Sequence, residues 1–332
     1  MKEVRFAFIW SLFFSFEVLL ASCSIIEDLQ PAKDKYEQSL KVLSIGSSFG
    51  VNTFVQFPAI CRLSGIEIIA GNLYKGACTL SDVADICKNG GSFAAGTIYT
   101  SDNPQWVSSC AGIIDMLQLY DWDIIILQRS APGNPGGSDR WTPDMESDLA
   151  YVINYVCESL PKRPLFLFNS GFSRPVCSIG SREKQLESVN NIMSTAKIVS
   201  DTFNIDIIPS GTAIHNARTT WLSSVETFNS LHYEIPDLAG EGDHLDTGLG
   251  SFILGCLLFE QICGNTFNLH IGKSMIIPRL SDVHNNAAGF ADSNFTQPTQ
   301  NQAMVAIESA LAAIKNPYQI DSTISHQYPS IF

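Results

Sequence analysis

Five short apolar runs constrain the fold more than any other feature of this chain. Each run is rich in β-branched or aromatic residues and is apolar on both faces, which is typical of buried parallel strands. The runs occupy residues 41–46, 66–70, 123–128, 164–169 and 205–209. The stretches between them that can form helices are 54–64, 105–119, 143–159 and 182–203. Alternating strands and helices predict right-handed βαβ units and an α/β fold with a doubly wound sheet.

Two further apolar segments follow the fifth run. Residues 248–263 are apolar almost all round, which predicts a helix packed inside the protein. Residues 302–315 carry Ala, Val, Ile and Leu at helical spacing, which predicts a last helix. No linker and no repeat divides this part of the sequence, so we expect a single domain over residues 41–332.

The N-terminal residues have the pattern of a lipoprotein signal peptide. A basic start is followed by a nearly apolar run over residues 6–20 and then by the sequence LASC, which ends at Cys23. We therefore expect a signal peptide over residues 1–22, a lipidated Cys23 and a polar tether over residues 23–40. An ordinary signal peptide cleaved nearby, or a chance cysteine, is the alternative. The expected location is the cell envelope of a Gram-negative bacterium, as an outer-membrane or periplasmic lipoprotein.

Composition limits the partners and cofactors. The formal charge of −13 argues against nucleic acid and anionic membrane surfaces, because both require clustered Lys and Arg, so membrane contact is expected only through the lipid anchor. No C-x-x-C or paired-His spacing occurs, so no metal and no cofactor is expected. Eight of the nine cysteines remain after Cys23. We expect zero to two disulfides among them, and the sequence leaves their pairing open.

Residues just after the expected strands are the first candidates for chemistry, because ligands of parallel α/β sheets bind at the carboxyl ends of strands. The first strand is followed by the sequence GSSFG over residues 46–50, where Ser48 can expose its hydroxyl above the sheet. The alternative is a serine that caps a helix. Gly76 follows the second strand, and Gln128 ends the third. Taken singly, they are equally well explained as a turn glycine and an amide bonded to local backbone.

His244 is the candidate base. It lies in the sequence EGDHLD over residues 241–246, just before the expected buried helix. An imidazole can accept the proton of a serine hydroxyl if a carboxylate orients it and stabilises its charged form. A histidine with acidic neighbours on a surface loop is the alternative.

Together, Ser, Gly, an amide and His fall in this order at the ends of successive expected strands. In this respect the sequence resembles the SGNH (GDSL-like) hydrolase superfamily, and in particular a bacterial lipoprotein branch of it. That branch carries GNSFS, GGCSL, LQQ and DGxHL, where this chain has GSSFG, GACTL, LQR and EGDHL, and the resemblance spans residues 41 to about 264. It implies a three-layer α/β/α sandwich around a five-stranded parallel, flavodoxin-like sheet.

The resemblance also implies roles for single residues. Ser48 would be the nucleophile and His244 the general base. The backbone N–H groups of Ser48 and Gly76 and the side chain of Gln128 would form the oxyanion hole, in which a single lost donor costs about 100- to 1,000-fold in rate. Glu241 would take the place of the triad aspartate.

Three positions depart from the wider superfamily. Gln128 stands where an asparagine is usual, Ser47 stands where an aspartate or asparagine is usual, and Glu241 stands in the place of the triad aspartate. Asp243 and Asp246 are alternative partners for the histidine, and a Ser-His dyad without an acid is a further alternative.

The expected activity is hydrolysis of an acyl ester, with an O-acetyl group on a carbohydrate as the favoured substrate and a small ester as an alternative. Arg218 and Asn216, which follow the fifth strand, are candidate substrate-binding residues; a salt bridge to the acidic surface is the alternative for Arg218. A second reading is a glycan-binding surface lipoprotein of the same fold without turnover. A third is a metal-dependent hydrolase that uses Asp243, His244 and Asp246. The oligomeric state stays open.

Overall fold

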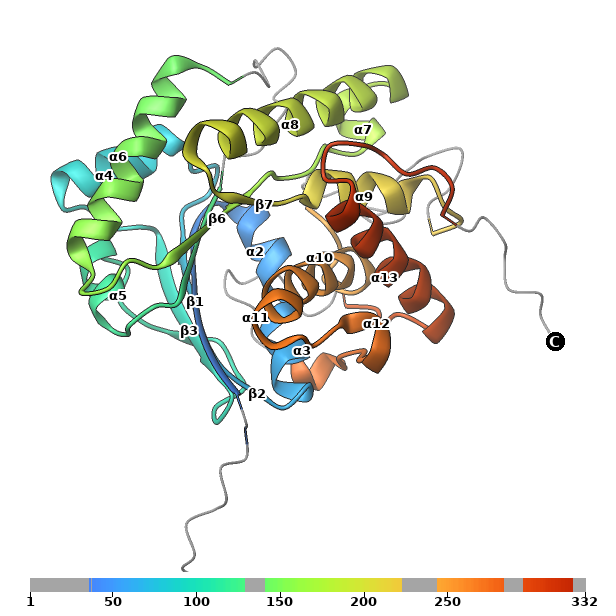
Figure 1. Ribbon diagram of the computed structural model, residues 1–332, viewed down its shortest axis with the longest axis horizontal. Coiled ribbons are helices and arrows are strands. Elements are labelled where there is room, and N and C mark those ends of the chain that lie inside the picture. The colour runs from blue at the N-terminus through green and yellow to red at the C-terminus, as the bar shows by residue number, and fades with distance from the viewer. Residues whose placement is uncertain (1–35, 37, 129–140, 223–243, 284–294, 325–332) are drawn as a thin grey trace, which may run out of the picture. The chain divides into compact units, whose positions relative to one another are not determined.

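The computed structural model describes residues 36, 38–128, 141–222, 244–283 and 295–324 (Figure 1). The chain from Gln38 onward forms one compact unit. The expected signal peptide, its lipidated Cys23 and nearly all of the expected tether lie outside the described residues.

A mixed sheet of seven strands forms the centre of this unit, in the order β4-β3-β2-β1-β5-β6-β7 (Figure 1). Strands β2, β1, β5, β6 and β7 are parallel to one another, whereas β3 pairs antiparallel with both β2 and β4. The strands are β1 Gln38–Gly46, β2 Ile66–Tyr74, β3 Ala95–Thr100, β4 Val107–Ser108, β5 Ile124–Gln128, β6 Leu165–Asn169 and β7 Asp206–Ile208.

The predicted α/β class is confirmed, but the prediction of a purely parallel sheet of five strands is incomplete. The helix expected over residues 105–119 begins only at Ile113, and Val107–Ser108 forms the edge strand β4 instead. The physical reason is Trp106, which is buried and packs on Tyr99 of β3 with 5.7 Å between ring centroids. This contact between residues of the same hairpin holds the segment against the sheet edge, and a helix starting at residue 105 would break it.

The expected tether is also three residues too long, because β1 begins at Gln38. Residues 38–40 pair in parallel register with residues 66–68 of β2. Leu40 is 3% exposed, so burial of its side chain draws the end of the expected tether into the sheet.

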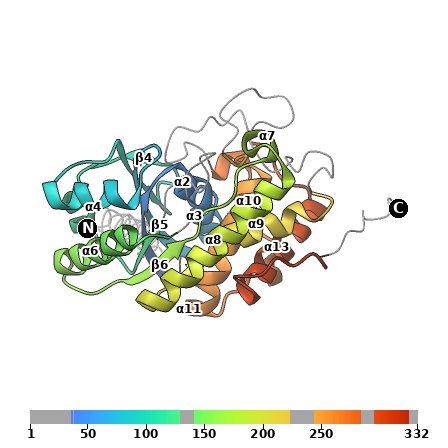
Figure 2. The ribbon, with the colours of Figure 1, turned by 90° about the horizontal axis from the view of Figure 1, so that it is seen from above.

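Helices cover both faces of the sheet, in the layers visible in Figures 1 and 2. On one face, α4, α5, α6 and the C-terminal part of α8 enclose a core with the sheet. On the other face, α2, α3, α9, α10 and α13 enclose a second core. The helices are α2 Ser48–Phe54, α3 Phe57–Leu63, α4 Leu80–Asn89, α5 Ile113–Gln118, α6 Pro143–Ser159, α7 Val176–Ile179, α8 Arg182–Phe203, α9 Ser210–Arg218, α10 Leu249–Phe259, a π-helix Glu260–Gly264, α11 Asn265–Phe267, α12 Ile271–Ser274, a 3₁₀ turn Leu280–Asp282 and α13 Gln300–Lys315.

Local capping explains why α6 and α8 match their expected bounds. Thr142 precedes α6 and accepts a hydrogen bond from the backbone N–H of Met145, with Pro143 at the first helical position. Ser181 caps the start of α8 in the same way. Asn204 ends α8 in the left-handed conformation, with φ of 52°. These signals are local, so the sequence predicts them well.

The apolar segment that starts α10 is a core helix of this fold. Within the described residues, Leu249–Phe267 is the segment long and apolar enough to cross a membrane, and 72% of its apolar 18-residue stretch is buried inside the protein. Every residue of α10 is buried. The expected helix over residues 248–263 is present, and its last turns widen into the π-helix.

The inner face of the parallel strands changes from apolar to polar toward their carboxyl ends. Four polar residues near these carboxyl ends share the face of the sheet that α2 and α10 cover, because side chains alternate between faces along a strand. They are all 2% exposed or less: Ser44, Asn72, Gln128 and Asn169. This buried polar row lies toward the carboxyl ends of the parallel strands, near the start of α2.

Candidate active site

The turn from β1 into α2 carries the candidate nucleophile. β1 ends at Gly46, Ser47 is the N-cap of α2, and Ser48 is the first helical residue. The backbone N–H of Gly50 donates to the carbonyl of Ser47 at 3.0 Å, which closes the turn. Ser48 is 7% exposed. A strand followed at once by a helix thus places the Ser48 hydroxyl at the carboxyl edge of the sheet.

The side chain of Gln128 binds the turn between β1 and α2. Its Nε2 donates to the carbonyl oxygen and to the Oγ of Ser47, at 3.0 Å each. A Cβ on Gly46 would lie 2.2 Å from Nε2, and a Cβ on Gly50 would lie 2.6 Å from Oε1. Glycine at both positions therefore admits the Gln128 side chain. Gln128 lies beside the Ser48 turn, as expected, but its amide hydrogens are directed at Ser47 and position the turn.

Gly76 lies in the turn after β2, beside the end of β1. The backbone N–H of Lys75 donates to the carbonyl of Gly46 at 3.0 Å, and the N–H of Cys78 donates to the carbonyl of Lys75 at 3.2 Å. Ala77 completes the turn in the left-handed region, with φ of 51°. The exposed Gly76 is therefore on the same edge of the sheet as the turn that carries Ser48.

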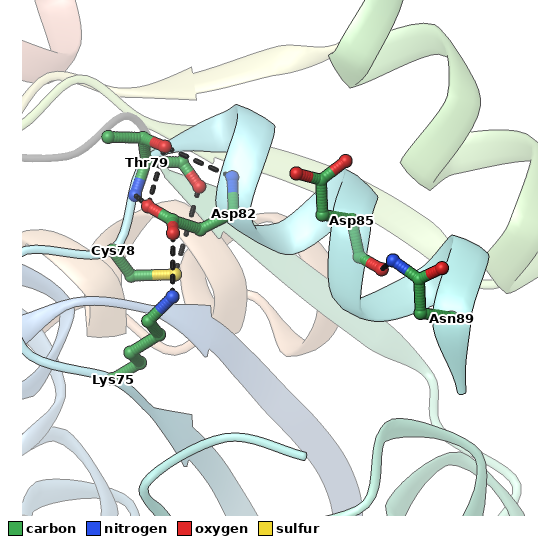
Figure 3. Close-up of polar contacts among 6 residues, drawn as sticks. All are labelled: Lys75, Cys78, Thr79, Asp82, Asp85 and Asn89. Carbon is green, nitrogen blue, oxygen red and sulfur yellow. Dashed lines mark hydrogen bonds and ion pairs between the residues drawn. The ribbon is translucent and has the colours of Figure 1, made fainter. Parts of the chain in front are cut away.

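An ion pair links the turn that contains Gly76 to the start of α4. Figure 3 shows Lys75 and Asp82 pointing toward each other, with Nζ and Oδ1 2.6 Å apart. The backbone N–H of Thr79 donates to Asp82 at 2.8 Å, and the N–H of Asp82 donates to the Thr79 hydroxyl at 3.0 Å. Partial burial raises the pKa of Asp82, but these bonds from Lys75 and Thr79 outweigh it and lower the pKa to about 2. The Asp82 carboxylate therefore stays charged over the physiological range.

Cys78, in the same turn, is a poor nucleophile. Burial, and then the charge of Asp82, raise the pKa of its thiol to about 12. The thiolate is the reactive form, so this thiol is inert near neutral pH. Ser48 is therefore the better nucleophile candidate at this edge.

Helix α2 and the N-cap of α3 bind the segment that begins at His244. Asn52 donates its side-chain N–H to the carbonyl of Leu245 at 3.1 Å. Gln56 donates to the carbonyls of Thr247 and Gly248 at 2.6 Å each. Side chains from α2 and from the residue that precedes α3 thus bind the segment that carries the candidate base.

Aromatic contacts extend this arrangement. The ring of Phe49, directly after Ser48, lies 6.2 Å from the His244 ring, centroid to centroid. Phe49 also stacks on Phe172, from the loop after β6, at 4.3 Å. The structure therefore brings the Ser48 and His244 segments to the same face and end of the sheet.

The structure describes only one of the three acidic residues that were considered as partners of His244. Glu241 and Asp243 lie outside the described residues. Asp246 is described, and its Oδ2 accepts the backbone N–H of Gly250 at 2.9 Å, so it caps the start of α10. Burial raises the pKa of Asp246 to about 7, against the lowering effect of backbone N–H groups led by that of Gly250. Asp246 is therefore bound to the start of α10, and burial disfavours the anionic form that a partner of the histidine would need.

Ionisation of Asp246 is expected to weaken the fold. Because its pKa is raised on folding from 3.8 to about 7, its stabilising effect is complete below about pH 4 and is lost as pH rises through 7. Relative to Asp246→Asn, the wild-type free energy of unfolding should fall by about 2–4 kcal/mol between pH 4 and pH 8. Urea unfolding of both proteins across this range measures the difference. A difference that stays constant with pH would contradict the assignment.

Arg218 and Asn216, the candidate substrate-binding residues, lie inside the protein. Arg218 is 2% exposed and donates Nη2 to the carbonyl of Ser173 at 2.8 Å, while burial lowers its pKa to about 9. Asn216 is fully buried, donates to the carbonyl of Ser309 at 3.3 Å and accepts the N–H of Asp321 at 2.8 Å. In these contacts Arg218 supports the loop after β6, and Asn216 joins α9 to the C-terminal segments.

Sequence reasoning missed the two amides that join the halves of the site. Asn52 lies in α2, and Gln56, four residues later, is the N-cap of α3. They interrupt an apolar stretch from Phe49 to Ile60, and this interruption is the signal that would have identified them. Within the described residues, no three His, Cys, Asp or Glu side chains are grouped so as to hold a metal ion.

The fold and these contacts define an α/β protein with a polar candidate site at the carboxyl edge of its parallel strands. The chain belongs to the family DUF4886, described as a domain of unknown function, whose model matches residues 41–291. A DUF4886 family protein from Bacteroides uniformis ATCC 8492 has a similar crystal structure, with a TM-score of 0.65 and 23% identity, covering 86% of this chain and 98% of that one. At this identity the likeness shows the fold alone. No protein with a curated description matches the chain.

Proposed function

We propose that this chain is a serine ester hydrolase of the SGNH type, with Ser48 as nucleophile and His244 as general base. The observation that carries the proposal is the contact between the two halves of the site. Asn52 of α2 and Gln56, the N-cap of α3, bind carbonyls within residues 245–248, directly after His244. These two side chains, which closely follow Ser48 in the chain, thereby hold the segment of the base near the nucleophile turn.

In the proposed reaction, the His244 imidazole removes the proton of the Ser48 hydroxyl as Oγ attacks the ester carbonyl. The backbone N–H groups of Ser48 and Gly76 stabilise the resulting oxyanion. Collapse of this tetrahedral intermediate breaks the ester bond, and the imidazolium returns the proton to the leaving alcohol. Water, deprotonated by His244, then hydrolyses the acyl-enzyme and releases the carboxylic acid.

The other side chains of the site have supporting roles in this proposal. Glu241 is the proposed acid that orients His244, since Asp246 is committed to the start of α10. Gln128 is a positioning residue, because its amide hydrogens bind Ser47. The strand order β2-β1-β5-β6-β7 of the parallel strands supports the finer assignment of a flavodoxin-like sheet, in which sites lie where the strand order reverses.

The proposed substrate is an acyl ester, with an O-acetyl group on a carbohydrate favoured, and no cofactor takes part. This choice rests on the resemblance to the superfamily and on the proposed place of the protein in the cell envelope, anchored through lipid on Cys23. Labelling of the full chain with a radioactive fatty acid, lost in Cys23→Ser, tests the anchor. Equal labelling of both proteins, or of neither, would contradict it.

Hydrolysis of p-nitrophenyl acetate by the chain lacking residues 1–23 tests the activity. We expect release of p-nitrophenol above the rate in buffer, with a rise through the pKa of a histidine. A serine-directed fluorophosphonate should modify Ser48, as read by mass spectrometry of the digested protein. A folded protein that releases no p-nitrophenol between pH 6 and pH 9 and leaves Ser48 unmodified would refute the proposal.

One observation favours a second candidate, a glycan-binding protein with this fold and little turnover. The amide of Gln128 is bound to Ser47, so the hole has one side-chain donor fewer than the superfamily pattern implies. Calorimetric titration with acetylated and deacetylated xylo-oligosaccharides separates the two candidates. Binding without release of acetate would favour this one.

A further inference from the structure

Two cysteines that are far apart in the chain lie in contact inside the protein. The Sγ atoms of Cys61 and Cys263 are 3.8 Å apart, across a sequence separation of 202 residues. Both residues are fully buried. Two thiol sulfurs at this distance are in van der Waals contact, and a disulfide requires them to approach to about 2.05 Å.

The two cysteines belong to the two helical segments that hold the halves of the candidate site. Cys61 is in α3, which follows α2 directly. Cys263 is in the π-helix Glu260–Gly264, which continues α10. The start of α10 lies beside the carbonyls that Gln56 binds, so the cysteine pair joins the same two segments at a second point. A covalent bond here would fix α3 to the end of the helix that follows His244.

The geometry points to Cys61 and Cys263 as a disulfide pair that closes while the chain folds in an oxidising environment. The oxidant is a disulfide of a small molecule or a protein. One cysteine thiolate attacks a sulfur of this disulfide, releases one thiol and forms a mixed disulfide; the second thiolate then displaces the other thiol. The protein loses two protons and two electrons, and the oxidant disulfide becomes two thiols.

Burial explains why closure belongs to folding. Burial raises the pKa of Cys61 well above its usual range, and the neighbouring Cys263 raises it further. In the packed protein this thiol is therefore protonated and hidden from an oxidant, whereas in the unfolded chain it ionises and is accessible.

Cys256 provides a matched control. It lies on α10, is fully buried like the pair, and its thiol pKa is also raised by burial. Among the described cysteines, the sulfur contact joins Cys61 to Cys263 and does not involve Cys256. Cys256 is therefore as buried as the pair, and it differs from them in lacking their sulfur–sulfur contact.

Refolding of the full chain with a mixture of glutathione and its disulfide tests the inference. Free thiols are then alkylated, and the unreduced protein is digested and examined by mass spectrometry. We expect a linked peptide of Cys61 and Cys263 that disappears on reduction, is absent from Cys61→Ala and Cys263→Ala, and persists in Cys256→Ala. Oxidised wild type should unfold about 5–10 °C above the reduced protein, because the bridge closes a loop of about 200 residues.

Alkylation of both Cys61 and Cys263 in the oxidised, refolded wild type would overturn the inference, as would a peptide in which either is linked to another cysteine. The peptide result uses wild-type protein, so it holds even if a variant fails to fold. It is also independent of ester hydrolysis, because it follows sulfur atoms alone.

Discussion

Replacing Ser48 with alanine is expected to lower kcat/KM for an acetyl ester by at least about 1,000-fold. The reason is that the variant lacks the oxygen that forms the acyl-enzyme, while the contacts that build the turn remain. Gln128 binds the backbone carbonyl and hydroxyl of Ser47, and Gly50 closes the turn on the same carbonyl. None of these bonds uses the Ser48 side chain, so the fold should persist.

Ser64→Ala is the matched control, because it also removes one serine hydroxyl. Ser64 follows α3 and precedes β2, at the opposite end of that strand from the Gly76 turn. Stopped assays with p-nitrophenyl acetate, together with circular dichroism, measure activity and folding for both variants. Retention of more than a tenth of the activity by folded Ser48→Ala would show that another group performs the chemistry.

Replacing Gly46 with alanine is expected to have the largest effect on stability at the site, a loss of about 3 kcal/mol in the free energy of unfolding. The added Cβ would lie 2.2 Å from Nε2 and 2.3 Å from Cγ of Gln128. Gln128 is 2% exposed and bound to Ser47, so its side chain has little room to retreat. The clash should also displace the turn that carries Ser48.

A double-mutant cycle distinguishes this clash from a general effect of alanine. Gln128→Ala removes the atoms that the new methyl group meets, so the double variant should recover about 1–2 kcal/mol relative to the sum of the single changes. Gly91→Ala is the control, because the nearest atom to its Cβ is 3.5 Å away. Urea unfolding measures the wild type and these four variants, and strict additivity of the Gly46 and Gln128 changes would contradict the interlock.

The regular elements show what local patterns predict well. The expected helices over residues 143–159 and 182–203 match α6 and α8, because their starts and ends carry capping residues that act within one turn. Strand β3 and edge strand β4 were missed. β3 lacks a long apolar run, and β4 has two residues, both exposed, so neither carries a strong local signal.

The candidate site divides in the same way. The position of Ser48 after a buried strand followed from the sequence GSSFG, since a strand end is a local feature. The docking of the His244 segment on Asn52 and Gln56 spans more than 190 residues and depends on how α2 packs on the sheet. No local pattern encodes such a contact.

The sequence by itself determined the α/β class, most strand and helix positions, and the residues at the strand ends, because burial and capping act on neighbours in the chain. Only the tertiary structure decided how these residues are used. It directs Gln128 to Ser47, assigns Asp246 to the start of α10, and places Cys61 against Cys263. Each of these outcomes depends on which polar or sulfur atom is nearest once both faces of the sheet are packed, and that distance is set by the whole fold.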